Sequence, residues 1–403
     1  MLRTADTVRL AGLGLLAIGV IAVHSAGMDP LARAGARPGA AAGEGGGVWA
    51  MFSTKHTALA VAAALLLLGM SRIDAGVWLR QRGWKNPVTF GLPIALGFCG
   101  AALIPGVGVE VNGATRWLAL PGGLSFQPSE LMKWALVAAL AAWCGLRGPK
   151  MARLGGGLLP AAGVTALACG LIVKEDLGTA ALLGGVAGVM LIAGGARLRH
   201  LAPVALIGIA AGAAFLATSP YRVRRLTAFL DPWADPMGSG YHPIQSMLGF
   251  AEGGVTGVGL GRSVQKYHVP EATTDFILPV ISEEMGLLAV ALIGLLFVSL
   301  VWSGVWVARR RTDATGRLLA LGIVTMVGTQ AVFNIAVVTV VVPTKGIALP
   351  LVSAGGTGWL LTAGALGVLA GLARGAEEQE SFGIVGLNAP AAGASPSLGS
   401  ASD

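Results

Sequence analysis

Long apolar blocks recur along the whole chain, and they constrain its fold more than any other feature of the sequence. Each block has about 15 to 25 residues, the length with which an α-helix crosses about 30 Å of hydrocarbon. The sequence therefore predicts an all-α polytopic membrane protein with about ten transmembrane helices. We place these helices near residues 8–27, 57–78, 88–104, 129–146, 154–173, 177–195, 201–218, 276–307, 318–342 and 359–373.

The composition agrees with a bundle embedded in lipid. Only 12% of the 403 residues are charged and 54% are hydrophobic, which excludes a single soluble globule because soluble domains carry roughly twice that share of charge. The 62 glycines allow helices to approach closely in a membrane. Cys99, Cys144 and Cys169 lie inside apolar blocks and form no CxxC pair, so we expect neither a disulfide nor a metal site from them.

The basic residues predict the orientation of the chain. The net charge is +8, but the basic residues are spread in twos and threes between the apolar blocks, which argues against a nucleic-acid partner. Most of them fall in short connections on the side of the N-terminus, so we expect both termini to be cytoplasmic. The first block follows Arg3 and Arg9 and also resembles a signal peptide; we favour a retained helix. We interpret residues 309–311 as a topology determinant and not as a lipid-binding site.

Two regions differ from the membrane spans. Residues 219–275 form the longest connection, an outward loop between the seventh and eighth spans, and its aromatic residues lead us to expect that it folds against the membrane surface. Within it, the glycine run at residues 253–261 lacks the βαβ context of a phosphate-binding loop, and we expect a flexible re-entrant turn. Residues 374–403 have little apolar content, so they predict a disordered cytoplasmic tail after a membrane domain of residues 1–373.

A short outward connection at residues 105–128 leads into a helix that begins at Pro128, a favoured first helical residue. Glu130 and Lys133, three residues apart, share one face of this helix and can form an ion pair. The spacing leaves a structural pair and a ligand-binding role equally open. Arg116 and Trp117 could hold an anionic or sugar-bearing group, or they could anchor a helix end at the interface.

The segment at residues 269–286 is the most informative. Asp275 stands where an N-cap belongs, so capping is the simplest explanation of that residue. Glu283 and Glu284 lie two turns inside the eighth block, where carboxylates are rare and mark functional sites. We therefore expect the three carboxylates to share one outward cavity. Lys345 lies in another outward segment, residues 341–358, whose irregular backbone is tolerated at that depth only around a cavity.

In this order the motifs resemble the SEDS family, the FtsW, RodA and SpoVE proteins of bacterial cell-wall synthesis. The resemblance runs from the first span to the tenth. The motifs that carry it are NGATRW (112–117), FQPSELMK (126–133), EDLGTA (175–180), YRVRRLTAFLDPWADPMGSGYHPIQS (221–246), GLGRSVQKYHVPEATTDFI (259–277), EEMG (283–286) and PTKGIALPLVSAGG (343–356).

The resemblance implies a ten-helix glycosyltransferase of the bacterial cytoplasmic membrane. Such an enzyme polymerises lipid II into glycan strands and works with a class B penicillin-binding protein, a transpeptidase, and with other divisome or elongasome proteins. The chain departs from the family pattern at Thr273, where many members have His, at Leu278 and Pro279, and at Ala354. The GLGRSVQK stretch is nearer to FtsW and SpoVE, whereas His242 and the SELMK ending are nearer to RodA, so a role in division and one in elongation both stay open.

The resemblance also implies a catalytic role for Asp275. We expect it to act as the base that takes a proton from the acceptor sugar, with its pKa raised by burial beside Glu283 and Glu284. No cofactor is evident, although a divalent cation such as Mg²⁺ held by the carboxylates could stabilise the departing pyrophosphate. The residues that we expect to bind the substrate are Arg116, Trp117, Glu130, Lys133, Arg225, Lys266, Glu283, Glu284 and Lys345.

Two other functions are weighed against polymerisation. A transporter that flips lipid II would also use ten helices and intramembrane charges, but we find no convincing internal repeat. A non-catalytic scaffold for the transpeptidase is disfavoured by the cluster of carboxylates.

Overall fold

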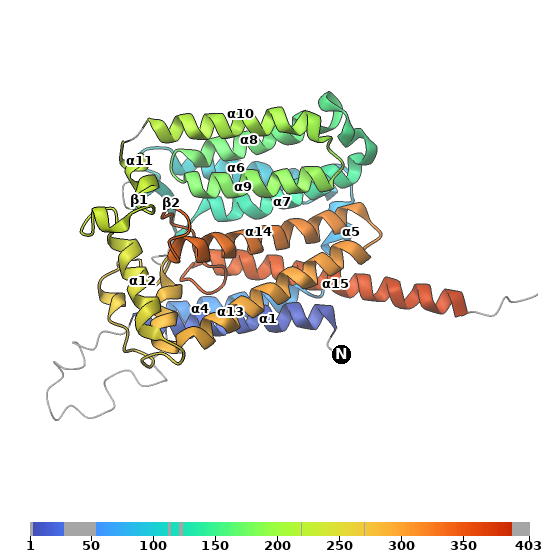
Figure 1. Cartoon of the computed structure of the whole chain (residues 1–403). Coiled ribbons are helices and arrows are strands. Elements are labelled where there is room, and N and C mark those ends of the chain that lie inside the picture. Colours follow the sequence, from blue (N-terminus) through green and yellow to red (C-terminus); the bar gives the residue numbers. More distant parts are fainter. Residues whose placement is uncertain are drawn as a thin grey trace, which may run out of the picture.

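The computed structural model describes residues 3–27, 54–111, 114–120, 124–218, 220–269 and 271–388. Its long helices run side by side along one axis and form an elongated bundle (Figure 1). These helices are α1 (Thr4–Ala26), α4 (Lys55–Met70), α6 (Val88–Ala102), α7 (Pro128–Arg147), α8 (Leu159–Val173), α9 (Leu177–Ala193), α10 (Leu198–Ala217), α13 (Ile277–Arg310), α14 (Ala314–Val338) and α15 (Thr357–Asn388).

This set of helices confirms the predicted architecture of a polytopic membrane protein. Within the described residues, seven helices are long and apolar enough to cross a membrane, and three shorter apolar helices, α4, α6 and α9, complete the ten predicted blocks. The remaining helical elements are short. They are α5 (Ala75–Leu79), α11 (Pro220–Thr227), α12 (Tyr241–Gly253), the 3₁₀ turns η1 (Gly83–Lys85), η2 (Gly148–Ala152), η4 (Pro232–Ala234) and η5 (Gln265–Tyr267), and the π turn η3 (Leu154–Leu158).

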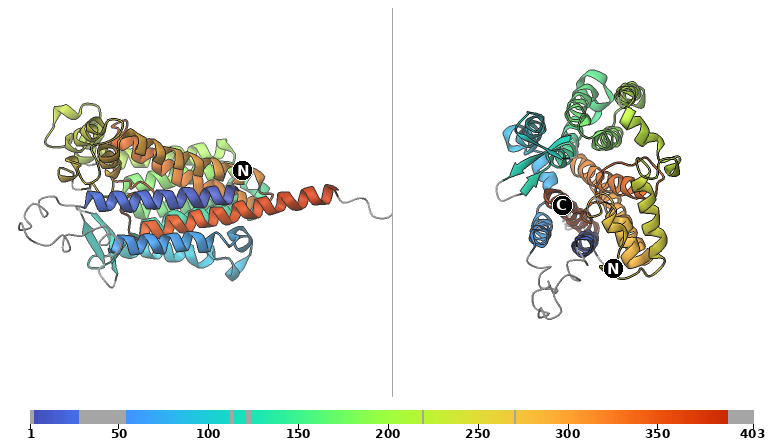
Figure 2. Two further views of the ribbon diagram at one scale, coloured as in Figure 1. Left: turned by 90° about the horizontal axis from the view of Figure 1, so that it is seen from below. Right: turned by 90° about the vertical axis from the view of Figure 1, so that its left-hand side faces the viewer.

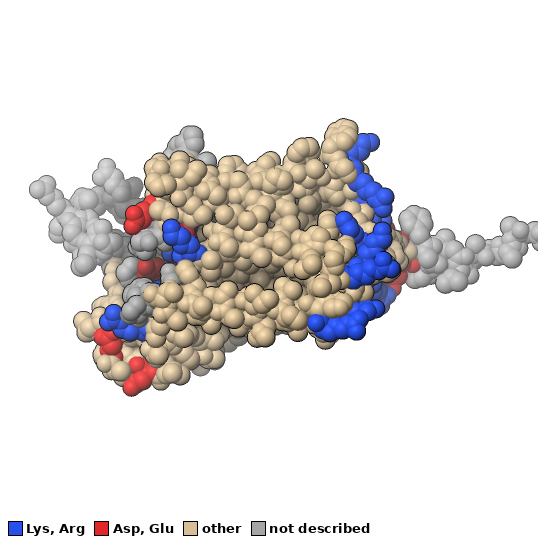
Figure 3. Space-filling view, turned by 90° about the horizontal axis from the view of Figure 1, so that it is seen from above, with Lys and Arg blue, Asp and Glu red and all other residues tan. Residues whose placement is uncertain are grey.

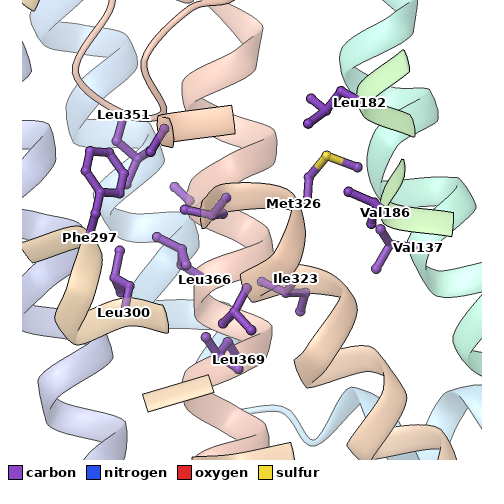
Figure 4. Packing of buried hydrophobic residues seen from close by; sticks show 14 of the residues in the cluster. Val137, Leu182, Val186, Phe297, Leu300, Ile323, Met326, Leu351, Leu366 and Leu369 are labelled. Carbon is purple, nitrogen blue, oxygen red and sulfur yellow. The ribbon is translucent and has the colours of Figure 1, made fainter. Parts of the chain in front are cut away.

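Helix α14 lies at the centre of the core. Its residue Met326 faces Val137 of α7 and the α9 side chains, while the α13 and α15 side chains lie on its other flank (Figure 4). Glycines make this packing possible: a Cβ atom at Gly304 would lie 1.9 Å from Val324 Cγ1, and one at Gly322 would lie 2.7 Å from Met190 Sδ. The close approach of helices at small residues, expected from the glycine content, is confirmed at these two positions.

Helix α10 lies at the edge of the bundle. Leu201 is its only buried residue, and side chains such as Ile207 and Ile209 are largely exposed. Helix α1, in contrast, is part of the core, with Val8 and Leu15 fully buried. Retention of the first block stays a prediction.

The connection at residues 105–128 contains a small antiparallel sheet that the sequence analysis did not predict. Its strands β1 (Gly108–Val111), β2 (Ala114–Leu120) and β3 (Leu124–Phe126) lie in that order. The sheet contacts α6 through an edge-to-face pair of Phe98 and Phe126, whose ring centroids are 5.6 Å apart. Asn112 and Gly113, which begin the NGATRW motif, lie outside the described residues; as a sequence, Asn-Gly is typical of a two-residue hairpin turn.

The long loop is folded, as expected. It contributes α11 and α12, and α12 packs directly on the start of α13: a Cβ atom at Gly253 would lie 1.9 Å from the carbonyl oxygen of Ser282. Ser246 Oγ also donates to the carbonyl of Val338 on α14 at 2.5 Å. The loop and the small sheet therefore cover the same end of the bundle (Figure 1). Contact with a membrane surface stays a prediction.

The start of α1 and the end of α15 lie at the other end of the bundle, opposite the long loop and the small sheet (Figure 2). The amide of Thr4 donates to Glu377 Oε1 at 2.7 Å. Helix α15 continues to Asn388, so the prediction of a disordered tail is wrong for residues 374–388. The run at residues 376–380, Ala-Glu-Glu-Gln-Glu, favours helix, and Arg374 lies 3.6 Å from Glu378, one turn further on. Residues 389–403 of the predicted tail lie outside the described residues.

Basic side chains gather at the end of the bundle from which α15 extends, whereas the other end carries both signs of charge (Figure 3). Arg309 and Arg310 of the basic run are exposed there, but Arg311 is buried. Its guanidinium lies 2.8 Å from Asp74 Oδ2 and 2.7 Å from Asp313 Oδ1, and it also donates to the carbonyl of Leu372 at 3.4 Å. Arg311 is therefore a structural clamp between α5, α14 and α15, and not only a topology signal.

We predict that Arg311→Met lowers the stability of the protein by about 3–5 kcal/mol, because it leaves two partly buried carboxylates without their cation. Thermal unfolding in detergent measures the effect. Arg310→Met is the matched control: its side chain is 51% exposed and pairs with Glu380, and such a surface pair contributes about 0–1 kcal/mol. Equal melting temperatures for the two variants would contradict the clamp.

Candidate functional site

Asp275 lies in the last turn before α13, at the end of the bundle that bears the small sheet and the long loop. The turn is closed by the carbonyl of Glu271, which accepts from the amide of Phe276 at 3.2 Å. The side chain of Asn334, on α14, donates to the carbonyls of Asp275 at 2.9 Å and of Ile347 at 2.7 Å. One buried amide therefore holds the Asp275 turn and residues 343–356 against α14.

The carboxylate of Asp275 does not cap α13. The N-cap residue of this helix is Phe276, and the cap has no side-chain hydrogen bond, so the capping explanation of Asp275 is wrong. The carboxylate instead lies against Gly346, where an added Cβ atom would come within 2.8 Å of Oδ2. A glycine at this position leaves room for the carboxylate beside the 343–356 segment.

The surroundings of Asp275 favour a proton acceptor at neutral pH. Burial, and then the negative charges of Asp176 and Glu271, raise the pKa of Asp275 to about 7, although nearby Arg116 opposes the shift. The direction of the pKa shift and the part played by burial agree with the expectation from the sequence, but the neighbouring charges are those of Asp176 and Glu271, and not those of Glu283 and Glu284. A carboxylate that is half ionised near neutrality suits general base catalysis.

The small sheet brings Arg116 to this place. Arg116 lies on β2, and its Nη1 atom is 3.7 Å from Asp176 Oδ2. The neighbouring amide of Thr115 donates to Glu175 Oε2 at 2.8 Å, which ties β2 to the turn between α8 and α9. Trp117 follows on the strand and pairs with Val109 of β1, whereas Arg116 is the extra residue at an irregularity in the pairing of β1 and β2.

Glu175 and Asp176 begin the EDLGTA motif but are not among the site residues expected from the sequence. Asp176 caps α9 by accepting from the amide of Thr179 at 2.9 Å and from its hydroxyl at 2.8 Å. Two adjacent acids at the outward end of an apolar block, with a Thr three residues after the Asp, were the available signal. An N-cap whose charge also reaches Asp275 could be recognised only in three dimensions.

Glu130 and Lys133 form the predicted ion pair, with Lys133 Nζ 2.8 Å from Glu130 Oε1. Lys133 is only 2% exposed and also donates to Gln330 Oε1 at 2.9 Å. Gln330 in turn donates to the carbonyl of Ala348 at 2.8 Å. The pair therefore links α7 to α14 and to the 343–356 segment that borders Asp275. A direct role for either residue in binding stays a prediction.

Glu283 and Glu284 do not share the surroundings of Asp275, so the prediction of one cavity for three carboxylates is wrong. Glu283 is 1% exposed and Glu284 is 3% exposed. Glu283 accepts from the hydroxyl of Ser263 and from the amide of Val264 at 2.6 Å. Glu284 accepts from the hydroxyl of Ser25, at the end of α1. Their oxygen atoms bind residues 261–266 and α1 to α13.

Lys266 belongs to the same buried network. Its ammonium group lies 3.6 Å from Glu284 Oε1 and donates to the carbonyls of Ser25 and Gly261, each at 3.0 Å. The structure thus brings Lys266 together with Glu284 and not with Asp275. Two of the residues predicted to bind substrate, Lys266 and Glu284, neutralise each other inside the protein.

This network surrounds a break in α13. Gly286 has φ 74° and ψ −176°, a left-handed conformation that favours glycine, and a Cβ atom there would lie 2.3 Å from the carbonyl of Val255. The glycine run at residues 253–261 fills the break: the amide of Val258 donates to the carbonyl of Glu283, and the amide of Gly259 to that of Glu284, both at 2.9 Å. The run is a turn bound to α13 and not a flexible one.

The last two predicted cations lie at the same end as Asp275. Lys345 precedes Gly346, which contacts the Asp275 carboxylate, and its side chain is half-buried. Arg225 lies on the exposed helix α11. The site thus consists of the Asp275 carboxylate, whose pKa is raised, with Arg116 beside it and two further cations, Arg225 and Lys345, on the surrounding segments.

Comparison with known proteins identifies the family. The model of the FtsW, RodA and SpoVE family, described as "Cell cycle protein", matches residues 10–378. Stage V sporulation protein E of Bacillus subtilis is 36% identical over 325 residues, which cover 80% of this chain and 87% of the relative. A probable peptidoglycan glycosyltransferase FtsW of Geobacter metallireducens is 40% identical over 308 residues, or 75% of this chain and 81% of the relative.

Solved structures agree. The rod shape determining protein RodA of Thermus thermophilus matches with a TM-score of 0.57 and 25% identity, over 91% of this chain and 95% of that one. A chain from a structure described as "Structural coordination of polymerization and crosslinking by a peptidoglycan synthase complex" matches with a TM-score of 0.64 and 27% identity, over 91% and 96% of the two chains. The protein is a member of the FtsW, RodA and SpoVE family of polytopic membrane proteins, which act in peptidoglycan synthesis.

Proposed function

We propose that the protein is a peptidoglycan glycosyltransferase that joins the disaccharide units of lipid II into glycan strands. The observation that carries this proposal is the carboxylate of Asp275, which has a pKa near neutrality, does not cap its helix and has Arg116 beside it. The printed name of the relative from Geobacter metallireducens, a probable peptidoglycan glycosyltransferase, supports the same activity.

In the proposed reaction Asp275 accepts the proton of the acceptor's sugar hydroxyl. The hydroxyl oxygen attacks the anomeric carbon of the donor, the bond to the polyprenyl pyrophosphate breaks, and the configuration at that carbon inverts. The leaving pyrophosphate needs positive charge. Arg116, Arg225 and Lys345 lie at the correct end of the bundle, whereas Lys133 and Lys266 are buried in ion pairs.

A divalent cation stays a prediction. Among the residues that the structure describes, no group of three or more His, Cys, Asp or Glu side chains is placed to hold a metal ion. The described side chains therefore do not fit a metal site made by the protein alone, and no step of the proposed mechanism depends on a metal.

We place the reaction on the outer face of the bacterial cytoplasmic membrane. The gathering of Lys and Arg at the opposite end of the bundle (Figure 3) supports a cytoplasmic location for that end and for both termini. The peptidoglycan synthase complex among the structural matches supports a class B penicillin-binding protein as the partner. A role in division or in elongation, with the other proteins of either machinery, is compatible with relatives named FtsW, SpoVE and RodA.

Replacement of the base tests the function. We predict that Asp275→Asn lowers the rate of lipid II polymerisation by at least about 10²-fold, the usual contribution of a general base, while the protein stays folded. Purified protein with labelled lipid II and a partner transpeptidase provides the assay, and Asp231→Asn, an exposed acid at the same end, is the control. Full glycan synthesis by Asp275→Asn would overturn the assignment. Translocation in liposomes without strands would favour a flippase, and neither activity would favour a scaffold.

The pH dependence follows from the raised pKa. Because the base must be ionised, kcat/KM should fall about tenfold per pH unit below pH 7. A profile that is flat from pH 5 to 8 would exclude Asp275 as the base.

Stability should show the opposite trend. The folded state holds the Asp275 proton more tightly than the unfolded state, since the pKa rises from 3.8 to about 7 on folding. This contribution to stability is present below pH 3.8 and is lost as the pH rises through 7. The melting temperature of Asp275→Asn relative to wild type should therefore increase between pH 5 and pH 8. A constant difference would show that the carboxyl group has an ordinary pKa.

A further inference from the structure

His242 lies beside the Asp275 turn but has no part in the mechanism described above. It is in the first turn of α12, and its ring stacks on that of Phe276 with centroids 5.5 Å apart and planes inclined by 24°. Its Nδ1 atom is buried and has no hydrogen-bond partner. Burial lowers the pKa of His242 below 6.5, with Glu271 and Arg225 acting in opposite directions. The neutral ring offers one donor and one acceptor.

Glu271 connects His242 to Asp275. Its carbonyl closes the turn that ends at Phe276, and its negative charge raises the pKa of both Asp275 and His242. The Oε2 atom of its side chain is buried and also lacks a hydrogen-bond partner. A third unpartnered buried atom, Nε of Arg116, belongs to the side chain that faces Asp176.

Unpartnered buried polar atoms cost about 1–3 kcal/mol each, so a cluster of them calls for an explanation. A bound ligand would supply the missing partners. The charges indicate which kind: Asp176, Glu271 and Asp275 together repel an anion, so the pyrophosphate of the substrate does not suit this side of the site. A neutral group that both donates and accepts hydrogen bonds, and that can lie against the flat face of an aromatic ring, fits the unpartnered atoms of His242 and Glu271, whereas the Arg116 cation remains available to the pyrophosphate.

We propose that His242 and Glu271 form a subsite that binds the sugar of the lipid-linked substrate through its hydroxyl or N-acetyl groups, next to Asp275. This inference rests on the proposed function. Glu271 Oε2 accepts from a sugar hydroxyl or amide, and His242 Nδ1 makes a second hydrogen bond, while Phe276 and the His242 ring shape the wall. The two side chains position the sugar so that its reacting hydroxyl meets the Asp275 carboxylate, and the anionic group is left to the cations.

Equilibrium binding to the full-length protein in detergent tests the subsite. Asp275→Asn serves as the background, because it prevents turnover. Two probes are compared: the lipid-linked disaccharide pyrophosphate, and the same polyprenyl pyrophosphate without sugar. Added to this background, Glu271→Gln and His242→Phe should each weaken binding of the sugar-bearing probe about tenfold, the effect of one hydrogen bond. Neither variant should weaken binding of the sugar-free probe, and Glu271→Gln, which removes a negative charge, can only strengthen it.

Two further variants separate binding from structure. His242→Phe keeps a ring to stack on Phe276 but removes the nitrogen, whereas His242→Asn removes the ring but places an amide atom where Nδ1 stands. His242→Asn should therefore retain affinity for the sugar-bearing probe to within about threefold. Glu252→Gln alters an exposed carboxylate on the same helix, α12, and should bind both probes like the background.

The outcomes distinguish the two proposals. If wild type polymerises lipid II and the background binds both probes, but Glu271→Gln and His242→Phe bind the disaccharide as tightly as the background, the subsite is wrong and the proposed function stands. An equal loss of affinity for both probes would also overturn the subsite, because it would indicate a general distortion. If wild type makes no glycan and the background binds neither probe, both proposals fail.

Discussion

Hydrocarbon offers no hydrogen-bond partner, and the structure depends on that constraint at every place where a helix is interrupted or a charge is buried. The break of α13 at Gly286 shows how it is met. The glycine run at residues 253–261 returns amide groups to the carbonyls that the break exposes. Glu283 and Glu284 then hold the adjoining segment through its amides and hydroxyls, and Lys266 balances the charge of Glu284.

The same constraint makes the surroundings of Asp275 distinctive. Around Gly286 the charged groups of Glu283, Glu284 and Lys266 all have partners, and Glu130 and Lys133 belong to a chain of hydrogen bonds that reaches Ala348. Beside Asp275, in contrast, atoms of His242, Glu271 and Arg116 are buried without partners. Unpartnered buried polar atoms also occur elsewhere, for example in Trp134 and Gln265, but beside Asp275 three of them come from three separate segments of the chain.

The sequence was sufficient to predict the membrane helices, because an apolar block of transmembrane length in a chain with so little charge can adopt few structures other than a membrane-spanning helix. The sequence was also sufficient for the ion pair of Glu130 and Lys133, whose spacing is local. It failed where the outcome depends on distant parts of the chain. Glu283 and Glu284 lie in a sequence context that is typical of functional acids. Only the position of residues 261–266 in the structure shows that these two carboxylates accept hydrogen bonds from that segment.

Other errors had physical causes of the same kind. The strand that carries Arg116 is short and lies between long apolar helices. Its alternation of polar and apolar residues was therefore too brief to predict a strand. Asp176 looks like an ordinary helix cap until β2 is placed beside it. The polar composition of residues 374–388 suggested disorder, but these residues extend a helix that the bundle has already begun, and such an extension needs no core of its own.

The weak attachment of α10 has a mechanical consequence. With Leu201 as its only buried residue, this helix contacts hydrocarbon chains over most of its surface, and its height and tilt are set largely by the bilayer. Its far end continues into α11, which bears Arg225. The thickness of the surrounding membrane is therefore transmitted to the end of the bundle that holds Asp275, so that the lipid helps to set the geometry of this end as well as acting as its solvent.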